Sequence, residues 1–416
     1  MLIIIGTGVL FDFVRSKIPR NTIRNFLTIR YTPVASLRTP LTWKDLIQKN
    51  SDLNGLKTEK LLKQSVKKSF NSNDDPIAVS LSSGIDSTLC LALLRDSFPN
   101  RKLFGVCAVF STNNNESKRA REIAKKFGAT FKIINVYSIF KKIPELVGIT
   151  GRPRWNTYQH LISKEAKKIS KFLVTGDGAD EIFAGYTFRY SKFLRLYTGN
   201  QNWKNKVMNY LECHNRDWVP DQKDMFGSGI RFSWNNTYSY FKPYFTNKLQ
   251  PVEQVILADL NGKLLYDYIP TGVSISKHYK INIIPIFLDN NVFNFGLKIP
   301  LEQKYDPKNQ KGKLILRKIA KRLDVDHIDE KKGFSPELFS DWKNHGKKIC
   351  EQYLLKKDSN IFQNKLINHN WILRAFEKIE NDGDIRYLNK LISILALEIW
   401  CRIFVTKEMT TRKILT

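Results

Sequence analysis

The chain has 416 residues, of which 42% are hydrophobic and 12% aromatic, so it can bury a sizeable core, and this composition excludes global disorder. Its 68 Lys and Arg residues outnumber its 39 Asp and Glu residues, and the net charge of +29 could attract nucleic acid or other polyanions. The lysines are spread along the whole chain, however, as a global composition bias would also produce. The five cysteines include no CxxC pair, which argues against a zinc site and fits a reducing compartment.

The N-terminal residues 1–58 contain strand-like pieces with little periodicity. The apolar run Met1–Leu10 ends before Asp12 and Arg15, so it is too short to span a bilayer. It also lacks the basic start and the small-residue cleavage site of a secretion signal. No other run is long enough to span, and we therefore expect a cytoplasmic protein without a membrane segment.

From residue 77 onward, apolar runs typical of strands alternate with helical patterns. We predict strands over Ile77–Leu81, Lys102–Phe110, Thr130–Val136 and Phe172–Thr175, and helices from Thr88, over Ser117–Phe127 and over Tyr158–Ile169. This alternation indicates a parallel, doubly wound α/β sheet with its ligand at the carboxyl ends of the strands. From about Tyr186 the pattern becomes helical. Leu314–Leu323 and Leu388–Val405 are predicted to be amphipathic helices packed on the sheet domain.

The segment Ser80–Thr88, with the sequence SLSSGIDST, joins the first predicted strand to the first helix. Small residues at a helix N-terminus present backbone N–H groups and the positive end of the helix dipole, which suit a phosphate. Ser82, Ser83 and Ser87 add hydroxyl donors. Asp86 adds a carboxylate that would repel a phosphate unless a cation such as Mg²⁺ lies between them. The segment thus predicts a metal-dependent nucleotide site, and a serine-rich helix cap is the alternative.

A second motif, Thr175–Tyr186, follows the last predicted strand and has the sequence TGDGADEIFAGY. Its small residues permit close approach of the backbone to a ligand. Three carboxylates fall within five residues, namely Asp177, Asp180 and Glu181, and such a cluster is costly unless a cation or a proton compensates. Two strand-end loops of complementary chemistry in one α/β domain favour a ligand site over a solvated acidic turn.

Together these motifs resemble the SGGxDS loop and the SGEGxDELFxGY motif of the asparagine synthetase family. Three later segments resemble the family's VRxPFLD, KxxLR and KxGF motifs, namely Ile284–Asp289, Lys313–Arg317 and Lys332–Pro336. Order and approximate spacing agree over about residues 59–345, and five ordered motifs are far more specific than one. The resemblance implies a fold of the PP-loop, adenine nucleotide alpha hydrolase-like type, with a helical C-terminal part packed on the sheet domain.

The resemblance also implies a role for individual residues. The ATP-binding residues would be Ser82, Gly84, Asp86 and Ser87 at the pyrophosphate, with Ser83 where the family has glycine, Ser80 and Val109 at the adenosine, and Thr175 and Gly176 beside the α-phosphate. Asp86 and Asp180 would hold Mg²⁺ on the pyrophosphate. Lys313 would contact the α-phosphate and stabilise charge in the transition states. Asp177, where the family has glutamate, would be the general base for the incoming amine.

The implied activity is that of an AMP-forming carbon–nitrogen ligase of amino-acid biosynthesis. A carboxylate would attack the α-phosphate of ATP to give an acyl-adenylate and pyrophosphate, and ammonia or an amine would then form the amide. The acid would be aspartate or an analogue. Thr271–Ile275 stands where the family has a D-R-x-S-M run near the amino-acid substrate, so other acids stay open.

Residues 1–58 depart most from the family pattern. Members that hydrolyse glutamine carry an N-terminal domain whose first mature residue is a catalytic cysteine, whereas here no cysteine precedes Cys90. Because Ile29–Leu41 resembles the tail of such a domain, we expect residues 1–58 to be a remnant that packs on a synthetase domain over residues 59–416. Nitrogen would come from free ammonia, a separate glutaminase partner or an amine-bearing substrate.

Three other functions are compatible with the sequence. The chain could join a different carboxylate and amine, as β-lactam synthetase and lasso-peptide cyclases do. It could act on tRNA, because aromatic and basic residues alternate over Tyr186–Phe245 and could stack bases and bind phosphates, although buried rings with snorkelling lysines give the same pattern. A silent scaffold is disfavoured, since Asp86, Asp180 and Lys313 are all present.

Overall fold

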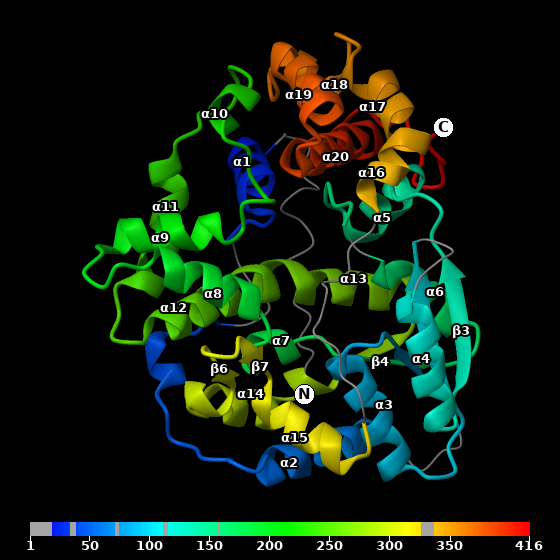
Figure 1. The fold of residues 1–416 in the computed structure, drawn as a ribbon. Helices are drawn as coiled ribbons and strands as arrows, with labels where there is room; N and C mark the ends of the chain where they lie inside the picture. Colours follow the sequence, from blue (N-terminus) through cyan, green and yellow to red (C-terminus); the bar gives the residue numbers. More distant parts are fainter. Residues whose placement is uncertain (1–18, 34–38, 71–74, 111–114, 157, 326–336) are drawn as a thin grey trace.

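Five parallel strands form the central sheet of the computed structural model, which describes residues 19–33, 39–70, 75–110, 115–156, 158–325 and 337–416 (Figure 1). The strand order is β3-β2-β1-β4-β5. The strands are β1 (Ile77–Ser80), β2 (Leu103–Val109), β3 (Thr130–Asn135), β4 (Phe172–Thr175) and β5 (Asn282–Pro285). The parallel sheet is confirmed, and the four predicted strands are correct to within one residue at each end. The fifth strand was not predicted, although Asn282–Pro285 lies in an apolar run, because this run had been assigned only to the motif Ile284–Asp289 that the strand enters.

The sheet is doubly wound, because alternate residues of its strands pack into two different cores. Ile77 and Val79 of β1 face the first core, whereas Ala78 faces the second. The first face is covered by α2 (Leu56–Ser69), α3 (Ile85–Ser97), α4 (Asn115–Lys126) and α15 (Leu314–Arg322). The second face is covered by α6 (Gln159–Lys167). The helix predicted from Thr88 begins three residues earlier, at Ile85.

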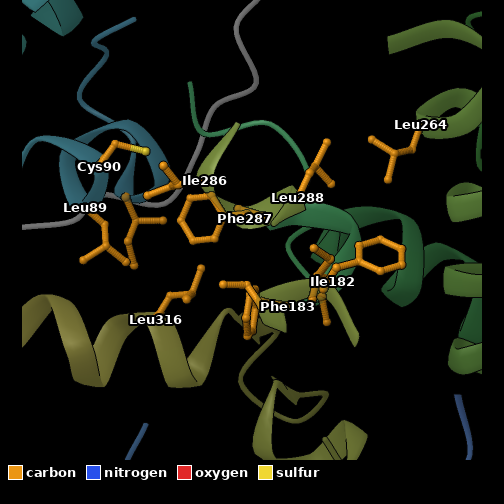
Figure 2. Packing of buried hydrophobic residues seen from close by; sticks show 14 of the residues in the cluster. Leu89, Cys90, Ile182, Phe183, Leu264, Ile286, Phe287, Leu288 and Leu316 are labelled. Atoms are coloured by element: carbon orange, nitrogen blue, oxygen red, sulfur yellow. The ribbon is translucent and has the colours of Figure 1, made fainter. Parts of the chain in front are cut away.

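A tightly packed part of the first core lies where the two predicted loops leave the sheet. Figure 2 shows Leu89 and Cys90 of α3 beside Ile286 and Phe287, with Leu316 of α15 packed below them. All five side chains are 0–1% exposed. Full burial of a leucine, isoleucine or phenylalanine side chain contributes about 1.5–3 kcal/mol to the stability of the fold. The packing of α15 against α3 holds the start of α15 beside the loop after β1.

The middle of the chain forms a helical layer beside the sheet (Figure 1). Its elements are α7 (Ala179–Ile182), α8 (Thr187–Leu196), α9 (Trp203–Glu212), α10 (Gln222–Met225), α11 (Trp234–Phe245), α12 (Pro251–Asp259), a π-helical segment (Leu260–Tyr268), α13 (Ile269–Tyr279) and α14 (Asn290–Leu297). The hairpin of β6 (Tyr305–Asp306) and β7 (Lys311–Gly312) precedes α15. The helical pattern predicted from Tyr186 onward is therefore observed.

The C-terminal helices form a core of their own around α20 (Ile385–Trp400), seen at the top of Figure 1. The helices around it are α1 (Arg20–Ile29), α5 (Ile143–Thr150), α16 (Leu338–Asp341), α17 (Lys347–Leu354), α18 (Asn360–Gln363) and α19 (His369–Asp382). α20 contacts α5, which follows β3 in the chain, so the helical part packs on the sheet domain through α5.

The helix predicted over Leu388–Val405 is observed as α20 and a short π-helical segment (Cys401–Val405), but the prediction that it is amphipathic was wrong, because every residue from Tyr387 to Trp400 is buried. A helix buried on all sides needs internal partners for its polar groups. The Lys390 ammonium donates to the carbonyl oxygens of Leu27 and Asp217, and the Glu398 carboxylate accepts from the backbone N–H of Ile361. Polar residues that indicate an exposed face in the sequence are thus satisfied inside the protein.

The described part of residues 1–58 contains α1, a 3₁₀ helix (Trp43–Leu46) and the start of α2 but no strand, so the prediction of strand-like pieces was wrong there. Met1–Leu10 lies outside the described residues. The expected packing on the rest of the chain is observed. The ring of Tyr31 stacks on that of Tyr266, with centroids 6.0 Å apart. The Asn261 side chain bonds both the N–H and the carbonyl of Leu41, at 2.6 and 2.9 Å.

Within the ranges that the structure describes, no helix combines the length and the apolar character needed to cross a membrane.

Candidate active site

The two predicted loops meet at the carboxyl ends of β1 and β4, where the strand order reverses direction. This topological switch point is where open α/β sheets bind ligands. A Cβ atom added to Gly176 would lie 2.7 Å from the Cβ of Asp86, so the absence of a side chain lets the loops touch. Between them lies a pocket of about 190 Å³, lined by Ser82, Gly84, Asp86, Ser87, Gly176, Asp177, Gly178, Asp180, Glu181, Tyr186 and Tyr268.

The serine hydroxyls of the first loop bond within the loop instead of capping α3. The Ser82 backbone N–H donates to Ser87 Oγ at 3.0 Å, and the two hydroxyl oxygens are 2.9 Å apart. The Gly84 N–H donates to Ser82 Oγ at 3.2 Å. The N-cap residue of α3 is Gly84, and among the described residues no side chain caps this helix. The geometry therefore differs from a serine-rich cap, and it leaves this helix N-terminus beside the pocket, as an anion site requires.

Lys313 connects three elements that lie far apart in the sequence. Its Nζ is 2.6 Å from Asp86 Oδ2 on α3 and 2.5 Å from Asp180 Oδ1 on α7. The residue is 4% exposed, and its backbone N–H donates to the Phe183 carbonyl at 3.1 Å. The structure therefore places three of the predicted site residues in direct contact beside the pocket.

The donor set at Asp86 and Asp180 fits Mg²⁺. The two carboxylates already converge on a cation, the Lys313 ammonium. Protein-bound Mg²⁺ commonly takes one or two carboxylates and completes its shell with water and phosphate oxygens. No group of three or more His, Cys, Asp or Glu among the described residues is arranged for a metal. A magnesium ion here would therefore depend on phosphate oxygens of a nucleotide.

Gly185 is required for this arrangement. A Cβ atom at this position would lie 1.9 Å from Asp180 Oδ1 and 2.3 Å from Lys313 Cε. We expect Gly185→Ala to separate the two side chains and to lower Mg²⁺- and ATP-dependent pyrophosphate release by at least about tenfold, since small displacements of catalytic groups are costly. Gly199→Ala is the control for a glycine replacement outside the pocket lining, because a Cβ there meets no described atom within 4 Å and its positive φ of 83° costs stability without touching the site. Equal activity of both variants would show that the Asp180–Lys313 contact is dispensable.

The predicted base, Asp177, lines the pocket, and neutral donors hold its carboxylate. Its Oδ2 accepts hydrogen bonds from Thr175 Oγ1 at 2.8 Å and from Gln159 Nε2 at 3.1 Å. Such bonds keep a carboxylate oriented. The side chain is therefore fixed at the pocket edge by two residues, of which Gln159 had not been considered.

The other predicted ATP-binding residues do not line this pocket. Ser80, Val109 and Thr175 end β1, β2 and β4, and Ser83 lies within the first loop. Val109 is 6% and Thr175 3% exposed. Their predicted roles at the adenosine and the α-phosphate stay predictions. The motif Lys332–Pro336 lies outside the described residues.

Three side chains that line the pocket had been given no individual role in the ATP site: those of Glu181, Tyr186 and Tyr268. Burial, reinforced by the charge of Asp180, raises the pKa of Glu181 to about 7. Its carboxylate accepts a 2.7 Å hydrogen bond from the Tyr186 hydroxyl. Glu181 and Tyr186 belong to the second motif, whose composition could have indicated them. Tyr268 ends the π-helical segment and has no sequence signal of its own.

The aromatic and basic residues of Tyr186–Phe245 form mainly an internal layer. Its buried rings are Tyr190, Phe193, Tyr210, Phe241 and Phe245. Several lysines lie over partly buried rings, as Lys206 does over Tyr197 and Lys242 over Trp203 at 5.6 and 5.4 Å from the ring centroids. The contacts favour buried rings with snorkelling lysines over a base-stacking surface.

The similarity to known proteins covers the part of the chain that forms this site. The model of the family described as asparagine synthase matches residues 57–402. Asparagine synthetase [glutamine-hydrolyzing] 1 of Bacillus subtilis is 24% identical over 375 residues, which cover 81% of this chain and 57% of that protein. The chain therefore corresponds to little more than half the length of this curated relative.

Two solved structures are distantly similar. One is an NH3-dependent NAD synthetase from Campylobacter jejuni, 15% identical, with a TM-score of 0.25, covering 48% of this chain and all of that chain. The other is the U34-tRNA thiolase NcsA from Methanococcus maripaludis, 12% identical, with a TM-score of 0.24, covering 69% of this chain and 87% of that chain.

Proposed function

This chain belongs to the asparagine synthase family, and from that premise we propose that it is an ATP-dependent amide ligase that adenylates a carboxylate and transfers the acyl group to ammonia or an amine. The observation that carries the proposal is the meeting of Asp86, Asp180 and Lys313 beside a pocket at the switch point of the sheet. A carboxylate is a poor acyl donor, and this site combines an anion-binding helix terminus with a buried cation, the features that adenylation requires.

In the first step, an oxygen of the substrate carboxylate attacks the α-phosphorus of ATP. The bond from the α-phosphorus to the bridging oxygen breaks, and pyrophosphate leaves with the electron pair. The Lys313 ammonium has three N–H donors, two of which face Asp86 and Asp180, and the third can bind the α-phosphate. The N-terminus of α3, with Ser82 and Ser87, would hold the pyrophosphate. Mg²⁺ held by Asp86 and Asp180 would supply neutralisation of the pyrophosphate charge.

In the second step, the nitrogen lone pair attacks the acyl carbon and AMP leaves with the electrons of the broken carbon–oxygen bond. A protonated amine cannot attack, so a base must take a proton first. We assign this role to Asp177, whose carboxylate Thr175 and Gln159 hold at the pocket edge. The second proton of the amine is released to solvent when the amide forms.

The proposed substrates are aspartate or an analogue as the acid, with nitrogen from ammonia, a separate glutaminase or an amine. We propose that residues 59–416 form the synthetase domain and that residues 1–58 are the remnant of a glutaminase domain. The close packing of Tyr31 and Leu41 on the π-helical segment supports a structural role for this remnant. A β-lactam-synthetase-like or peptide-cyclising reaction uses the same first step and differs only in its substrates.

The proposal predicts that pyrophosphate and AMP, not ADP and phosphate, are produced from ATP and Mg²⁺ in the presence of the correct acid and amine. The measurement is pyrophosphate release across a panel of carboxylates, with ammonium and primary amines as acceptors. Production of ADP would rule out adenylation. Release that requires tRNA, with tRNA binding that weakens steeply with salt, would favour the tRNA alternative.

A further inference from the structure

One wall of the pocket contains groups that the adenylation step does not use. Glu181 is 3% exposed, lines the pocket and accepts a hydrogen bond from the Tyr186 hydroxyl. Tyr268, from a different segment of the chain, lines the same pocket and is half-buried. A substrate that binds next to the nucleotide would thus contact a buried carboxylate and two tyrosines.

The charged side chains that line the pocket are all negative. The lining residues include four carboxylates, those of Asp86, Asp177, Asp180 and Glu181, and among the described residues no Lys, Arg or His lines the pocket. Lys313 contacts Asp86 and Asp180 from beside the pocket. A second carboxylate on a substrate would therefore meet like charges at Glu181, whereas a cation would meet opposite charge.

Arg189, which lies against Tyr186, is already engaged by other groups. The Arg189 guanidinium lies 3.9 Å from the centroid of the Tyr186 ring and forms a 3.0 Å ion pair with Asp259. One face of the Tyr186 ring is therefore covered by a cation. Tyr268 remains as the aromatic surface for a ligand, and aromatic rings attract ammonium groups. A carboxylate, a hydroxyl and a ring are together the groups that bind a protonated amine.

The surface of α13 next to Tyr268 is open at Gly272. Gly272 lies one helical turn after Tyr268, on the same face of the helix, and a Cβ there meets no described atom within 4 Å. A substrate larger than ammonia would therefore find room beside Tyr268. On this basis we propose that Glu181, Tyr186 and Tyr268 bind the protonated primary amino group of an organic substrate. The proposal rests on the proposed ligase function for the reaction in which that substrate is used.

Two sources of the amino group share this chemistry: the amine that attacks the acyl-adenylate, and the α-amino group of an amino acid that is being adenylated. ATP–pyrophosphate exchange distinguishes them, because it needs the acid but no acceptor. If the group belongs to the acid, aspartate supports exchange in the wild type, succinate does not, and Glu181→Gln raises the KM for aspartate at least about tenfold. If it belongs to the acceptor, Glu181→Gln leaves exchange unchanged and raises the KM for n-butylammonium by the same factor.

A structural role for Glu181 would alter nucleotide binding as well. We expect the KM for ATP to change less than about twofold in Glu181→Gln and in Tyr268→Leu, and all constants to stay unchanged in the control Glu122→Gln on the exposed side of α4. Gly272→Leu should raise the KM for n-butylammonium without affecting that for ammonium. The assignment would be overturned if both Glu181→Gln and Tyr268→Leu kept the wild-type KM for aspartate and for n-butylammonium. It would also be overturned if the KM for ATP rose as much as the KM for the amine.

A binding measurement keeps this inference separate from the ligase proposal. In thermal unfolding with ATP and Mg²⁺ present, n-butylammonium chloride should stabilise the wild type and Glu122→Gln more than sodium chloride does at equal ionic strength. It should not stabilise Glu181→Gln. If n-butylammonium stabilised the wild type but no acid supported ATP–pyrophosphate exchange, the amine site would stand and the ligase proposal would be rejected. No stabilisation of the wild type would reject the amine site.

Discussion

Replacement of Lys313 by methionine is expected to reduce pyrophosphate release by about 10²- to 10³-fold, the usual cost of removing a preorganised group that stabilises transition-state charge. Lys313 is buried, and its ammonium lies within 2.6 Å of carboxylate oxygens of both Asp86 and Asp180. Methionine has similar volume but no charge. Lys313→Arg is not expected to restore activity, because a planar guanidinium cannot replace a compact ammonium between two carboxylates. The measurement is single-turnover pyrophosphate release at saturating ATP and Mg²⁺.

Lower stability has to be separated from lost chemistry in this variant. Removal of Lys313 leaves two carboxylates close together, and breaking a buried ion pair costs about 3–5 kcal/mol. In the double variant Lys313→Met with Asp180→Asn, the repulsion is relieved, so we expect thermal stability to recover while activity stays absent. Lys321→Met, at an exposed position on the same helix, is the matched control. Full activity in the recovered double variant would contradict the role assigned to Lys313.

Asp86→Asn is expected to have a comparable effect, of at least about a hundredfold, and to change the response to Mg²⁺. Asparagine keeps the size and one oxygen of the side chain but removes the charge that a hard divalent ion requires. We therefore expect the Mg²⁺ concentration for half-maximal pyrophosphate release to rise markedly. Loss of the Asp86 carboxylate removes about 0.3–1 kcal/mol of helix-dipole stabilisation and one of the two carboxylates paired with Lys313. Because Lys313 keeps Asp180 as a partner, we expect a smaller loss than the about 3–5 kcal/mol of a fully broken buried pair, and thermal unfolding checks that the variant is folded.

The control for Asp86→Asn lies on the same helix. Asp96 is exposed near the end of α3 and pairs with Lys63 at 2.9 Å, so Asp96→Asn should keep the wild-type Mg²⁺ response. Pyrophosphate release would be titrated with MgCl₂ at fixed ATP and constant ionic strength. An Asp86→Asn variant with an unaltered Mg²⁺ midpoint would remove Asp86 from the metal site, whatever its overall rate.

Much of the sheet and both loops could be predicted because their signals are local. Ile77–Val79 and Phe172–Thr175 are apolar runs bounded by turn residues, and in a parallel sheet such runs are buried on both faces. Small residues directly after a strand leave a helix N-terminus open to a ligand, as in the loop before α3. The helix α20 shows the limit of this reasoning. Its lysine and glutamate suggested an exposed face, but distant backbone groups satisfy both of them inside the protein.

The sequence by itself therefore determined the parallel sheet, the two loops and the chemical character of each, since these depend on residues within a few positions of one another. Only the tertiary structure decided which side chains meet. Lys313 contacts Asp86 across 227 positions, and Tyr268 reaches the wall that contains Glu181 at the end of an irregular helix without a motif. The physical reason is that such contacts arise from packing of whole elements, here α15 against α3 and the π-helical segment against Tyr31 and Leu41, and no local pattern encodes that packing.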